Sequence, residues 1–362
     1  MRKIFKFMLI NVLLLTLSLG LLGCEDETEY HRFSYRYFDT FDTVTDVVGY
    51  AETEEEFDEH AEYIETRMQE LHKIFDRFRD YEGINNIKTI NDNAGETPVE
   101  VPPEILDLIQ FSKDWYEPTQ GKMNITIGPV SSIWSRYRDD ADYDPENAEI
   151  PPMEELEAAA EHVDINKIVL DHENNTVFLE DPDMILDVGA VAKGYAVEIV
   201  AKEVIERGFT SGIISVGGNV RTFGKPLDGV RDRWGVGVRD PHGPAFGGDS
   251  VDTVFLNDAS VVSSGDYQRY YIVDGEVMHH LIDPDTLMPG NHYSAVTVIT
   301  QDSGLADYLS TAVFLLPFDE SLALVESLED VDALWVMKDG EVLFSDGLED
   351  KLRSQGASGS DN

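Results

Sequence analysis

Apolar residues recur every three or four positions between residues 55 and 78, in the stretch EEFDEHAEYIETRMQELHKIFDRF. This spacing predicts a long amphipathic helix, because residues three and four apart lie on one helical face. Two further helices are expected after proline pairs, from Glu104 to Tyr116 and from Met153 to His162. The predicted buried stripe of the first helix is Phe57, Ala61, Ile64, Met68, Leu71, Phe75 and Phe78.

Short runs rich in β-branched and aromatic residues occupy much of the remaining chain. Many are separated by only a few turn residues, which favours antiparallel pairing over β-α-β crossovers. The predicted fold class is therefore α+β, with antiparallel sheets flanked by helices. Two polar segments, RDDADYDPENAEIPP and DPHGPAFGGDS, are expected to be exposed loops. The predicted strands lie in FDTFDTVTDVVGY, KIVLD, NTVFLE, MILDV, SGIISVG, RWGVGVR, DTVFL, ASVVSS, RYYIVDG and SAVTVIT.

The N-terminal residues have the pattern of an export signal. Basic residues at positions 2, 3 and 6 precede an apolar run that ends in Leu-Leu-Gly-Cys, which resembles the bacterial lipobox, where the cysteine is acylated. Cys24 is the only cysteine, so the chain cannot form an internal disulfide. We expect a signal peptide at 1–23, lipidation of Cys24, an acidic tether at 24–35, one folded domain at 36–348 and a disordered tail at 349–362.

Either this lipid anchor or, alternatively, an uncleaved N-terminal anchor would hold the domain on the outer face of the bacterial cell membrane. The chain is also strongly acidic, with 71 Asp and Glu residues against 27 Lys and Arg, a formal net charge of −44. Self-repulsion on this scale excludes nucleic acid as a partner. Any site that binds phosphate must therefore supply its own local cations.

One stretch, LDVGAVAKGYAVEIV, places a cation where a helix dipole disfavours it. A helix is expected to begin near Ala190 and to end at Gly208, so Lys193 falls in its first turn. Free N–H groups at that helix start, together with Lys193, form a site for phosphate oxygens. The alternative is that Asp187 caps the helix and pairs with Lys193.

Three other stretches carry weaker signals when each is taken alone. The double glycine Gly217-Gly218 follows a β run and is more often a turn than a ligand loop. His279 and His280 precede Asp283-Pro284 and are more often ordinary strand residues. Asp307 and Thr311 lie four apart and share one helical face, so that both can reach one hard cation whose shell a backbone carbonyl completes. The alternative is a helix with a capping acid and a buried threonine.

Taken in order, these four stretches resemble the ApbE family of FAD:protein FMN transferases. The matching segments are DVGAVAKGYAVE, VGGNVRTFGKP, SSGDYQRYY followed by HHLIDP, and ADYLSTA, and the resemblance runs from Asp39 to about Leu316. The family motif Asp-x-Gly-Ala-x-Ala-Lys-Gly matches Asp187, Gly189, Ala190, Ala192, Lys193 and Gly194. The resemblance thus implies an ApbE-like flavin transferase fold and supplies an anion for Lys193, the pyrophosphate of FAD.

The resemblance also implies the remaining site residues. It gives Mg²⁺ three protein ligands, the carbonyl of Ala190 and the side chains of Asp307 and Thr311. His280 and Asp307 are both candidates for the general base, and the sequence does not choose between them. The residues implied to bind FAD are Phe41, Phe78, Lys122, Met123, Asn124, Asp187, Lys193, Gly217, Gly218, Ser264, Gly265, His280 and Leu281.

The implied reaction moves FMN from FAD onto a Ser or Thr hydroxyl of an exported flavoprotein, such as a subunit of an ion-pumping redox complex, and releases AMP. One alternative is a Mg²⁺-dependent FAD pyrophosphatase, in which water replaces the hydroxyl. Another is a flavin-binding lipoprotein without catalysis. Three positions depart from the family pattern: Asn124 stands where many members have Asp, Phe78 where Tyr is frequent, and Leu287 where glycine is expected. These departures concern contacts to the flavin and not the proposed metal ligands.

Overall fold

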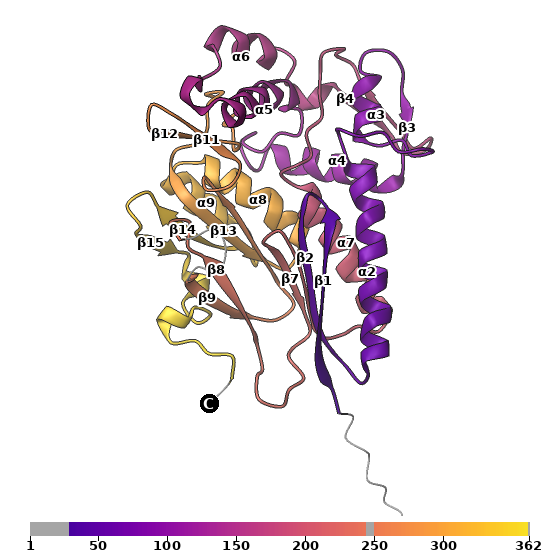
Figure 1. The fold of residues 1–362 in the computed structure, drawn as a ribbon, viewed down its shortest axis with the longest axis vertical. Helices are drawn as coiled ribbons and strands as arrows, with labels where there is room; N and C mark the ends of the chain where they lie inside the picture. The colour runs from indigo at the N-terminus through magenta and orange to yellow at the C-terminus, as the bar shows by residue number, and fades with distance from the viewer. Residues whose placement is uncertain (1–28, 244–249, 361–362) are drawn as a thin grey trace, which may run out of the picture.

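The computed structural model describes residues 29–243 and 250–360, and its centre is an eight-stranded antiparallel sheet (Figure 1). The strand order is β1-β2-β6-β7-β10-β13-β14-β15. This architecture confirms the predicted α+β class. The strands of the sheet are β1 (His31–Thr40), β2 (Thr43–Ala51), β6 (Gly212–Val216), β7 (Asn219–Phe223), β10 (Ser260–Gly265), β13 (Tyr293–Thr300), β14 (Asp332–Met337) and β15 (Val342–Phe344).

Three small antiparallel sheets surround the large one. They pair β11 (Tyr270–Val273) with β12 (Glu276–His279), β8 (Trp234–Arg239) with β9 (Ser250–Leu256), and β3 (Val99–Glu100) and β4 (Ile168–Asp171) with β5 (Thr176–Leu179). Two-residue turns join β1 to β2, β6 to β7 and β11 to β12, and the left-handed backbone at Asp274 and Gly275 closes the hairpin of β11 and β12. Such turns match the right-handed twist of the strands.

The longest helix, α2 (Glu54–Phe75), runs along one side of the molecule in Figure 1. The side chain of Thr53 caps it by accepting a hydrogen bond from Glu56 N at 3.2 Å, and its first turn is acidic, as the helix dipole favours. Its apolar stripe packs on β1, β2 and α7. The other α-helices are α3 (Ile87–Asp92), α4 (Pro103–Tyr116), α5 (Gly128–Tyr143), α6 (Met153–Ala160), α7 (Ala192–Glu206), α8 (Ser303–Leu315) and α9 (Phe318–Ser327).

Helix α8 lies inside the molecule and organises the site. It begins at Asp302, whose side chain accepts a hydrogen bond from Leu305 N, and nearly all its residues are buried. A helix that is buried on all sides is expected to be apolar throughout, so the few polar residues of α8 need a reason to be there. Those residues include Asp307, Ser310 and Thr311, which point toward one end of α7 and β10.

Several expectations about secondary structure are wrong. Helix α2 ends at Phe75, because the carboxylate of Asp76 accepts hydrogen bonds from Phe78 N and Arg79 N and turns the chain away. Phe78 is consequently 69 % exposed and does not belong to the buried stripe. The third predicted helix ends at Ala160, two residues early. The expected loop at 138–152 is helical through Tyr143, where α5 continues.

Met184, Leu186 and Val188 are buried, but residues 184–188 do not form the predicted strand. The side chain of Asn91 bonds both the N–H and the carbonyl of Leu186, and Asp187 N donates to Ile125 O, so side-chain and loop partners replace a ladder. The tether expected at 24–35 is also shorter, since β1 begins at His31 and pairs with β2.

The C-terminal residues to 360 are ordered, contrary to the expected tail. Leu352 is fully buried and forms a bridge with Val254, and short 3₁₀ turns at Asp346–Leu348 and Arg353–Gln355 pack this segment on β14 and β9. Further 3₁₀ turns lie at Pro145–Asn147 and Ile165–Lys167. The predicted signal peptide, Cys24 and part of the loop DPHGPAFGGDS lie outside the described residues. Within the described part of the chain, no helix combines the length and apolarity that crossing a membrane requires.

Candidate active site

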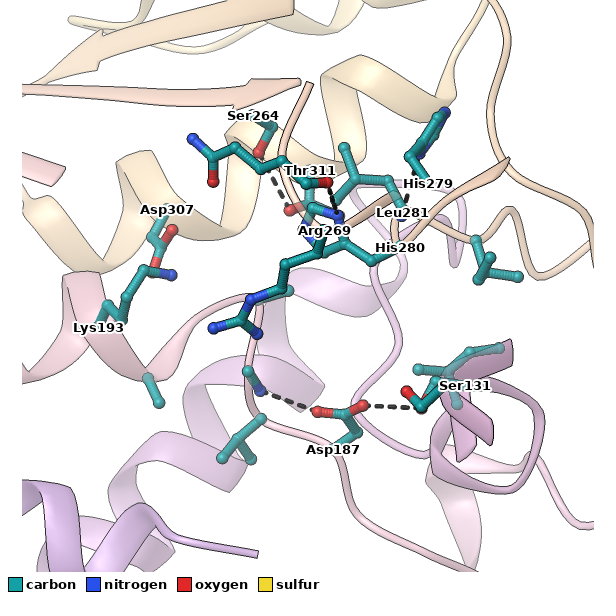
Figure 2. Close-up of a pocket in the computed structure, with 18 of the residues that line it drawn as sticks. Ser131, Asp187, Lys193, Ser264, Arg269, His279, His280, Leu281, Asp307 and Thr311 are labelled. Carbon is teal, nitrogen blue, oxygen red and sulfur yellow. Dashed lines mark hydrogen bonds and ion pairs between the residues drawn. The ribbon is translucent and has the colours of Figure 1, made fainter. Parts of the chain in front are cut away.

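A cavity of about 430 Å³ lies between the upper end of α2, α5, the start of α7, α8 and the hairpin of β11 and β12. Of the residues expected from the sequence, all but Gly218 line this cavity. Segments more than two hundred residues apart in the chain, such as the β1–β2 turn and α8, thus meet at one place. Figure 2 labels ten of the lining residues, which come from α5, the segment before α7, α7 itself, β10, the β11–β12 region and α8.

Two tight turns form one edge of the cavity. Phe41 and Asp42 join β1 to β2 with φ of 51° at both, a left-handed backbone that is uncommon for residues other than glycine. Gly217 and Gly218 join β6 to β7 with the same handedness, and Gly217 N donates to Val44 O. A Cβ at Gly217 would meet Thr43 at 2.6 Å, so the close approach of the two turns requires glycine there. Gly218 lies at the outer corner of its turn, away from the cavity lining.

The junction of α7 and α8 holds the candidate metal ligands. Gly194 N donates to Asp307 Oδ2 at 2.8 Å, and Lys193 Nζ lies 3.9 Å from the same oxygen. A Cβ at Gly194 would meet Ser303 O at 2.2 Å, so only glycine allows α7 to approach α8 this closely. Ser264 Oγ bonds Ser310 Oγ at 2.8 Å and lies 3.5 Å from Thr311 Oγ1.

These contacts place Asp307, Thr311 and Ser264 on one wall, where Ala190 also lines the cavity. Among the described residues, the buried carboxylate of Asp307 receives a single hydrogen bond and one distant lysine. A buried carboxylate with so few partners is costly unless a cation joins it. Carboxylate, hydroxyl and carbonyl oxygens are the ligands that Mg²⁺ prefers, so this set fits such an ion.

The alternative role for Asp187, as a cap of α7 paired with Lys193, is wrong. The helix is preceded by Val191 and has no side-chain cap. Asp187 Oδ1 instead accepts a hydrogen bond from Gly189 N at 3.1 Å, and its Oδ2 accepts from Ser131 Oγ at 2.7 Å and lies 3.2 Å from Arg77 Nη1. Lys193 therefore does not pair with Asp187 and faces the cavity beside Asp307 (Figure 2).

The two adjacent histidines have different surroundings. His279 is buried, its Nε2 bonds Gly290 O at 2.7 Å and its Nδ1 accepts from Leu281 N, so both nitrogens are used within the fold. Burial lowers the pKa of His279 to about 4. His280 Nδ1 bonds Gln268 O at 3.1 Å, which makes Nδ1 the protonated nitrogen and leaves Nε2 as a base. Burial, followed by His279, Arg269 and Lys193, lowers the pKa of His280 to about 3.

The segment from Lys122 to Asn124 lines the cavity, but its polar groups already form hydrogen bonds with other parts of the protein. Lys122 Nζ bonds both oxygens of Asp283 at 2.8 and 3.0 Å and Asp285 at 2.7 Å. Met123 is buried and its carbonyl accepts the hydroxyl of Tyr308. Asn124 Oδ1 accepts from the backbone and hydroxyl of Thr126. Where many family members carry Asp, Asn124 thus shapes a local turn.

Sequence reasoning missed several lining residues, above all Arg269 and Arg77. Arg269 has a left-handed backbone with φ of 46°, and among the described residues its guanidinium makes no hydrogen bond or ion pair. Figure 2 shows that it reaches into the space between Lys193 and Asp187. Both arginines lie inside quoted stretches, Arg269 in SSGDYQRYY and Arg77 near the end of the first helical stretch, but a charged residue beside an aromatic gave no distinguishing signal. The cavity thus gathers several cations on a chain whose net charge is −44.

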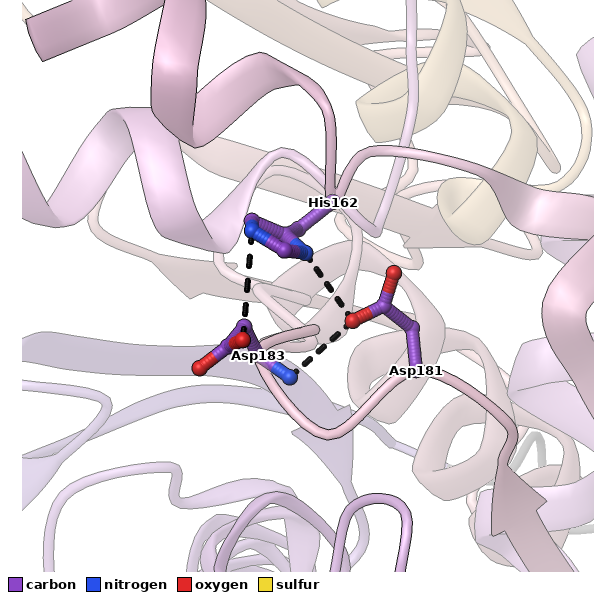
Figure 3. Close-up of side chains that lie close together, drawn as sticks. All are labelled: His162, Asp181 and Asp183. Atoms are coloured by element: carbon purple, nitrogen blue, oxygen red, sulfur yellow. Dashed lines mark hydrogen bonds and ion pairs between the residues drawn. The ribbon is translucent and has the colours of Figure 1, made fainter.

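A second group with metal-ligand side chains lies outside the cavity (Figure 3). His162, Asp181 and Asp183 have ligand atoms within 4.8 Å of one another. However, Asp181 already accepts from His162 Nδ1 at 2.9 Å, Asp183 N at 3.0 Å and Lys167 Nζ at 2.9 Å. These donors hold the pKa of Asp181 near 2, chiefly through Lys167. The carboxylate of Asp181 is already satisfied by three protein donors, so this group is an ion-pair cluster and does not supply the metal site.

Buried oxygens, a lysine at the start of a helix and, among the described residues, the unpaired guanidinium of Arg269 around one cavity are typical of enzymes that bind a phosphorylated ligand beside a divalent metal. Comparison with known proteins agrees with this class. A family model described as the ApbE family matches residues 41–335, and the chain belongs to this family.

The relatives of the chain align with most of its length. It is 30 % identical over 291 residues to a FAD:protein FMN transferase of Klebsiella pneumoniae, covering 79 % of this chain and 86 % of that one. A protein of the same name from Treponema pallidum is 30 % identical over 304 residues, with 81 % of each chain covered. The crystal structure of the ApbE protein of Thermotoga maritima superposes with a TM-score of 0.75 at 28 % identity, covering 88 % of this chain and 98 % of that one. These matches agree with the predicted ApbE-like fold.

Proposed function

We propose that the protein is a Mg²⁺-dependent FAD:protein FMN transferase that moves FMN from FAD onto a Ser or Thr of an exported flavoprotein and releases AMP. The observation that carries the proposal is the α7–α8 junction, where Lys193 and the under-satisfied carboxylate of Asp307 face one cavity. The names of the curated relatives support the same reaction. The acidic surface outside the cavity makes a concentrated cationic pocket selective for an anionic ligand.

In this proposal, each element of the cavity has a distinct task. Lys193 contacts the diphosphate through its ammonium group, because the N–H groups of Val191, Ala192, Gly194 and Tyr195 already donate within the protein. Asp307, Thr311 and the Ala190 carbonyl would hold Mg²⁺, which would supply positive charge beside the phosphate oxygens. Phe41 and the exposed ring of Phe78 border the same cavity and offer flat apolar surfaces to the flavin.

The reaction breaks the bond between the FMN phosphorus and the bridging oxygen of AMP and forms a bond from that phosphorus to the acceptor hydroxyl oxygen. The hydroxyl proton needs a base, and we assign this role to His280 Nε2, because the Nδ1 contact fixes the required tautomer. Asp307 is committed to Gly194 N and the metal and is a poorer candidate. Bound diphosphate next to Arg269 and Lys193 offsets two of the charges that hold the pKa of His280 down.

A second candidate function is hydrolysis of FAD to FMN and AMP, because water reaches the same phosphorus wherever a hydroxyl does. The test is to incubate the protein lacking residues 1–24 with FAD, Mg²⁺ and a protein acceptor of the FAD:protein FMN transferase of Vibrio cholerae, to which this chain is 26 % identical over 272 residues. Intact mass and released nucleotides are measured. One added FMN phosphoryl unit per acceptor, with AMP formed in step and both lost on chelation, supports transfer. Free FMN and AMP with an unmodified acceptor identifies a hydrolase, and unchanged FAD contradicts both reactions.

The proposal places the reaction on the outer face of the bacterial cell membrane, with the protein anchored through lipidated Cys24. The support is the sequence pattern of residues 1–24. Two or more acyl chains are needed for stable anchoring, since one chain gives only marginal binding. Cys24→Ser is expected to remove incorporation of labelled palmitate and to release the protein from the membrane fraction. Retention of both would contradict the anchor.

A further inference from the structure

The hairpin of β11 and β12 has one face in the candidate active site and the other in solvent. Tyr271 and Met278 pair across the strands, are buried and line the cavity. Ile272 and Val277 pair on the opposite face, where they are 54 % and 42 % exposed, and Tyr270 on the same face is 44 % exposed. Three of the eleven large apolar residues that are exposed in the described part of the chain therefore lie on this one hairpin.

The hairpin also lacks the usual protection of a sheet edge. It forms a separate two-stranded sheet, and within residues 29–243 and 250–360 neither strand pairs with a third. Exposed edges are normally blunted by Lys, Pro or bulges, but the strands read YYIV and EVMH and pair in regular register. An open edge beside an apolar stripe is a surface on which another extended segment can add as a strand.

The position of the hairpin matches what a protein substrate requires. Arg269 precedes β11 and His280 follows β12, and both line the cavity. A strand added to the hairpin therefore runs past the proposed base. Because side chains alternate across a strand, a Ser or Thr that points into the cavity leaves its two neighbours on the outer face, beside Ile272 or Val277.

We propose that the hairpin of β11 and β12 is the docking surface for the acceptor, whose target segment adds as a third strand with its Ser or Thr directed into the cavity. This inference rests on the proposed transferase function. Asp274 in the turn and Glu276 at the start of β12 are both exposed, on an already acidic chain. The segment that fits is therefore extended and free of acidic residues, with apolar or β-branched residues on both sides of the hydroxyl.

The test compares two outer-face variants, Ile272→Glu and Val277→Glu, with Val169→Glu, an exposed valine on β4 outside the cavity lining. Transfer to a protein acceptor of the Vibrio cholerae transferase is measured over a range of acceptor concentrations, and FAD binding by flavin fluorescence. The expected result is a loss of about tenfold or more in kcat/KM for the acceptor in both hairpin variants, carried by KM, with FAD affinity unchanged. Val169→Glu is expected to match the wild type.

Each outcome decides between the readings. Wild-type transfer by Ile272→Glu and Val277→Glu would overturn the docking surface while the transferase function stands. Parallel loss of FAD affinity would also overturn it, because the hairpin would then support the cavity only. Absence of transfer by the wild type refutes the proposed function and removes this inference with it. A second arm changes both neighbours of the target hydroxyl in the acceptor to Asp, which is expected to raise KM for the wild type similarly.

Discussion

Two carboxylates, Asp307 and Asp181, each lie beside a lysine, yet their surroundings differ. Asp181 receives a hydrogen bond from His162, a second from a backbone N–H and a third from Lys167 at 2.9 Å. Asp307 is more deeply buried, receives one backbone hydrogen bond among the described residues, and has Lys193 at 3.9 Å. The cluster around Asp181 resembles a metal site only in its residue types. The surroundings of Asp307 resemble one because this carboxylate has few protein donors among the described residues.

This contrast shows that unsatisfied charge at a cavity is a better sign of function than the number of clustered ligand residues. Protein donors saturate Asp181, so a metal would have to displace Lys167 and His162. At Asp307 the fold keeps donors away, and Gly194 is required so that two helices can approach this closely. The poorly paired carboxylate of Asp307 therefore lowers stability, whereas the well-paired carboxylate of Asp181 raises it.

The largest expected difference concerns turnover. Asp307→Ala is expected to lower Mg²⁺-dependent transfer by roughly 10² to 10³-fold, since it removes the anionic ligand of the metal. Asp181→Ala, the matched control, is expected to leave transfer near the wild-type rate once the protein is folded. The measurement is the initial rate of acceptor modification as Mg²⁺ is varied, with circular dichroism to check folding. Equal rates for Asp307→Ala and wild type would remove the metal assignment.

A smaller effect is expected for the two lysines. Lys193→Met is expected to weaken FAD by about tenfold or more, because a charge-assisted contact to phosphate is lost, and to leave riboflavin binding almost unchanged. Lys167→Met removes a cation of the same type from the ion-pair cluster and is expected to change neither affinity. Titration of flavin fluorescence measures both ligands. Equal loss of FAD and riboflavin by Lys193→Met would indicate a structural lysine.

When stability is measured instead of turnover, changing Asp181 is expected to have a larger effect than changing Asp307. Asp181→Asn is expected to lower the free energy of unfolding by about 1 kcal/mol, because the partly exposed donors of His162 and Lys167 lose a charged acceptor. Asp307→Asn keeps an acceptor for Gly194 N and removes a poorly paired buried charge, so it is expected to unfold at the same or a higher urea concentration. Urea unfolding at pH 7 tests both variants. A larger loss for Asp307→Asn than for Asp181→Asn would contradict the comparison.

The sequence predicted those features that depend on local pattern. The stripe of α2 and the pairing of short strands follow from residue spacing, and the four motifs brought nearly all the expected residues to one cavity. The end of α2 was not predicted, because the side chain of Asp76 rather than a proline or glycine redirects the chain. Helix α5 was missed because its second half is polar and acidic, RDDADY, which also suits a loop.

Contacts between distant segments were the least predictable part of the site. The pairing of Asp187 with Arg77 and Ser131 depends on three segments that meet only in the folded chain. Arg269 gave no periodic or spacing signal, and its importance appears only because it lies unpaired at the cavity. The family resemblance predicted which motifs lie together. The structure showed which charged side chains in these motifs remain poorly paired.

The smallest expected effect is a pH dependence confined to the ion-pair cluster. The pKa of Asp181 is lowered from 3.8 to about 2, first by Lys167, so its stabilising contribution is complete above pH 3.8 and is lost as the pH falls toward 2. The gap in unfolding free energy between wild type and Asp181→Asn is therefore expected to be constant from pH 7 to 5 and to shrink between pH 4 and 2.5. Lys167→Met removes the main cause of the shift, so in its background the gap is expected to be smaller and to close at a higher pH. Urea midpoints at half-unit pH steps measure this, and a gap that widens as pH falls would show that the carboxylate is not held by these donors.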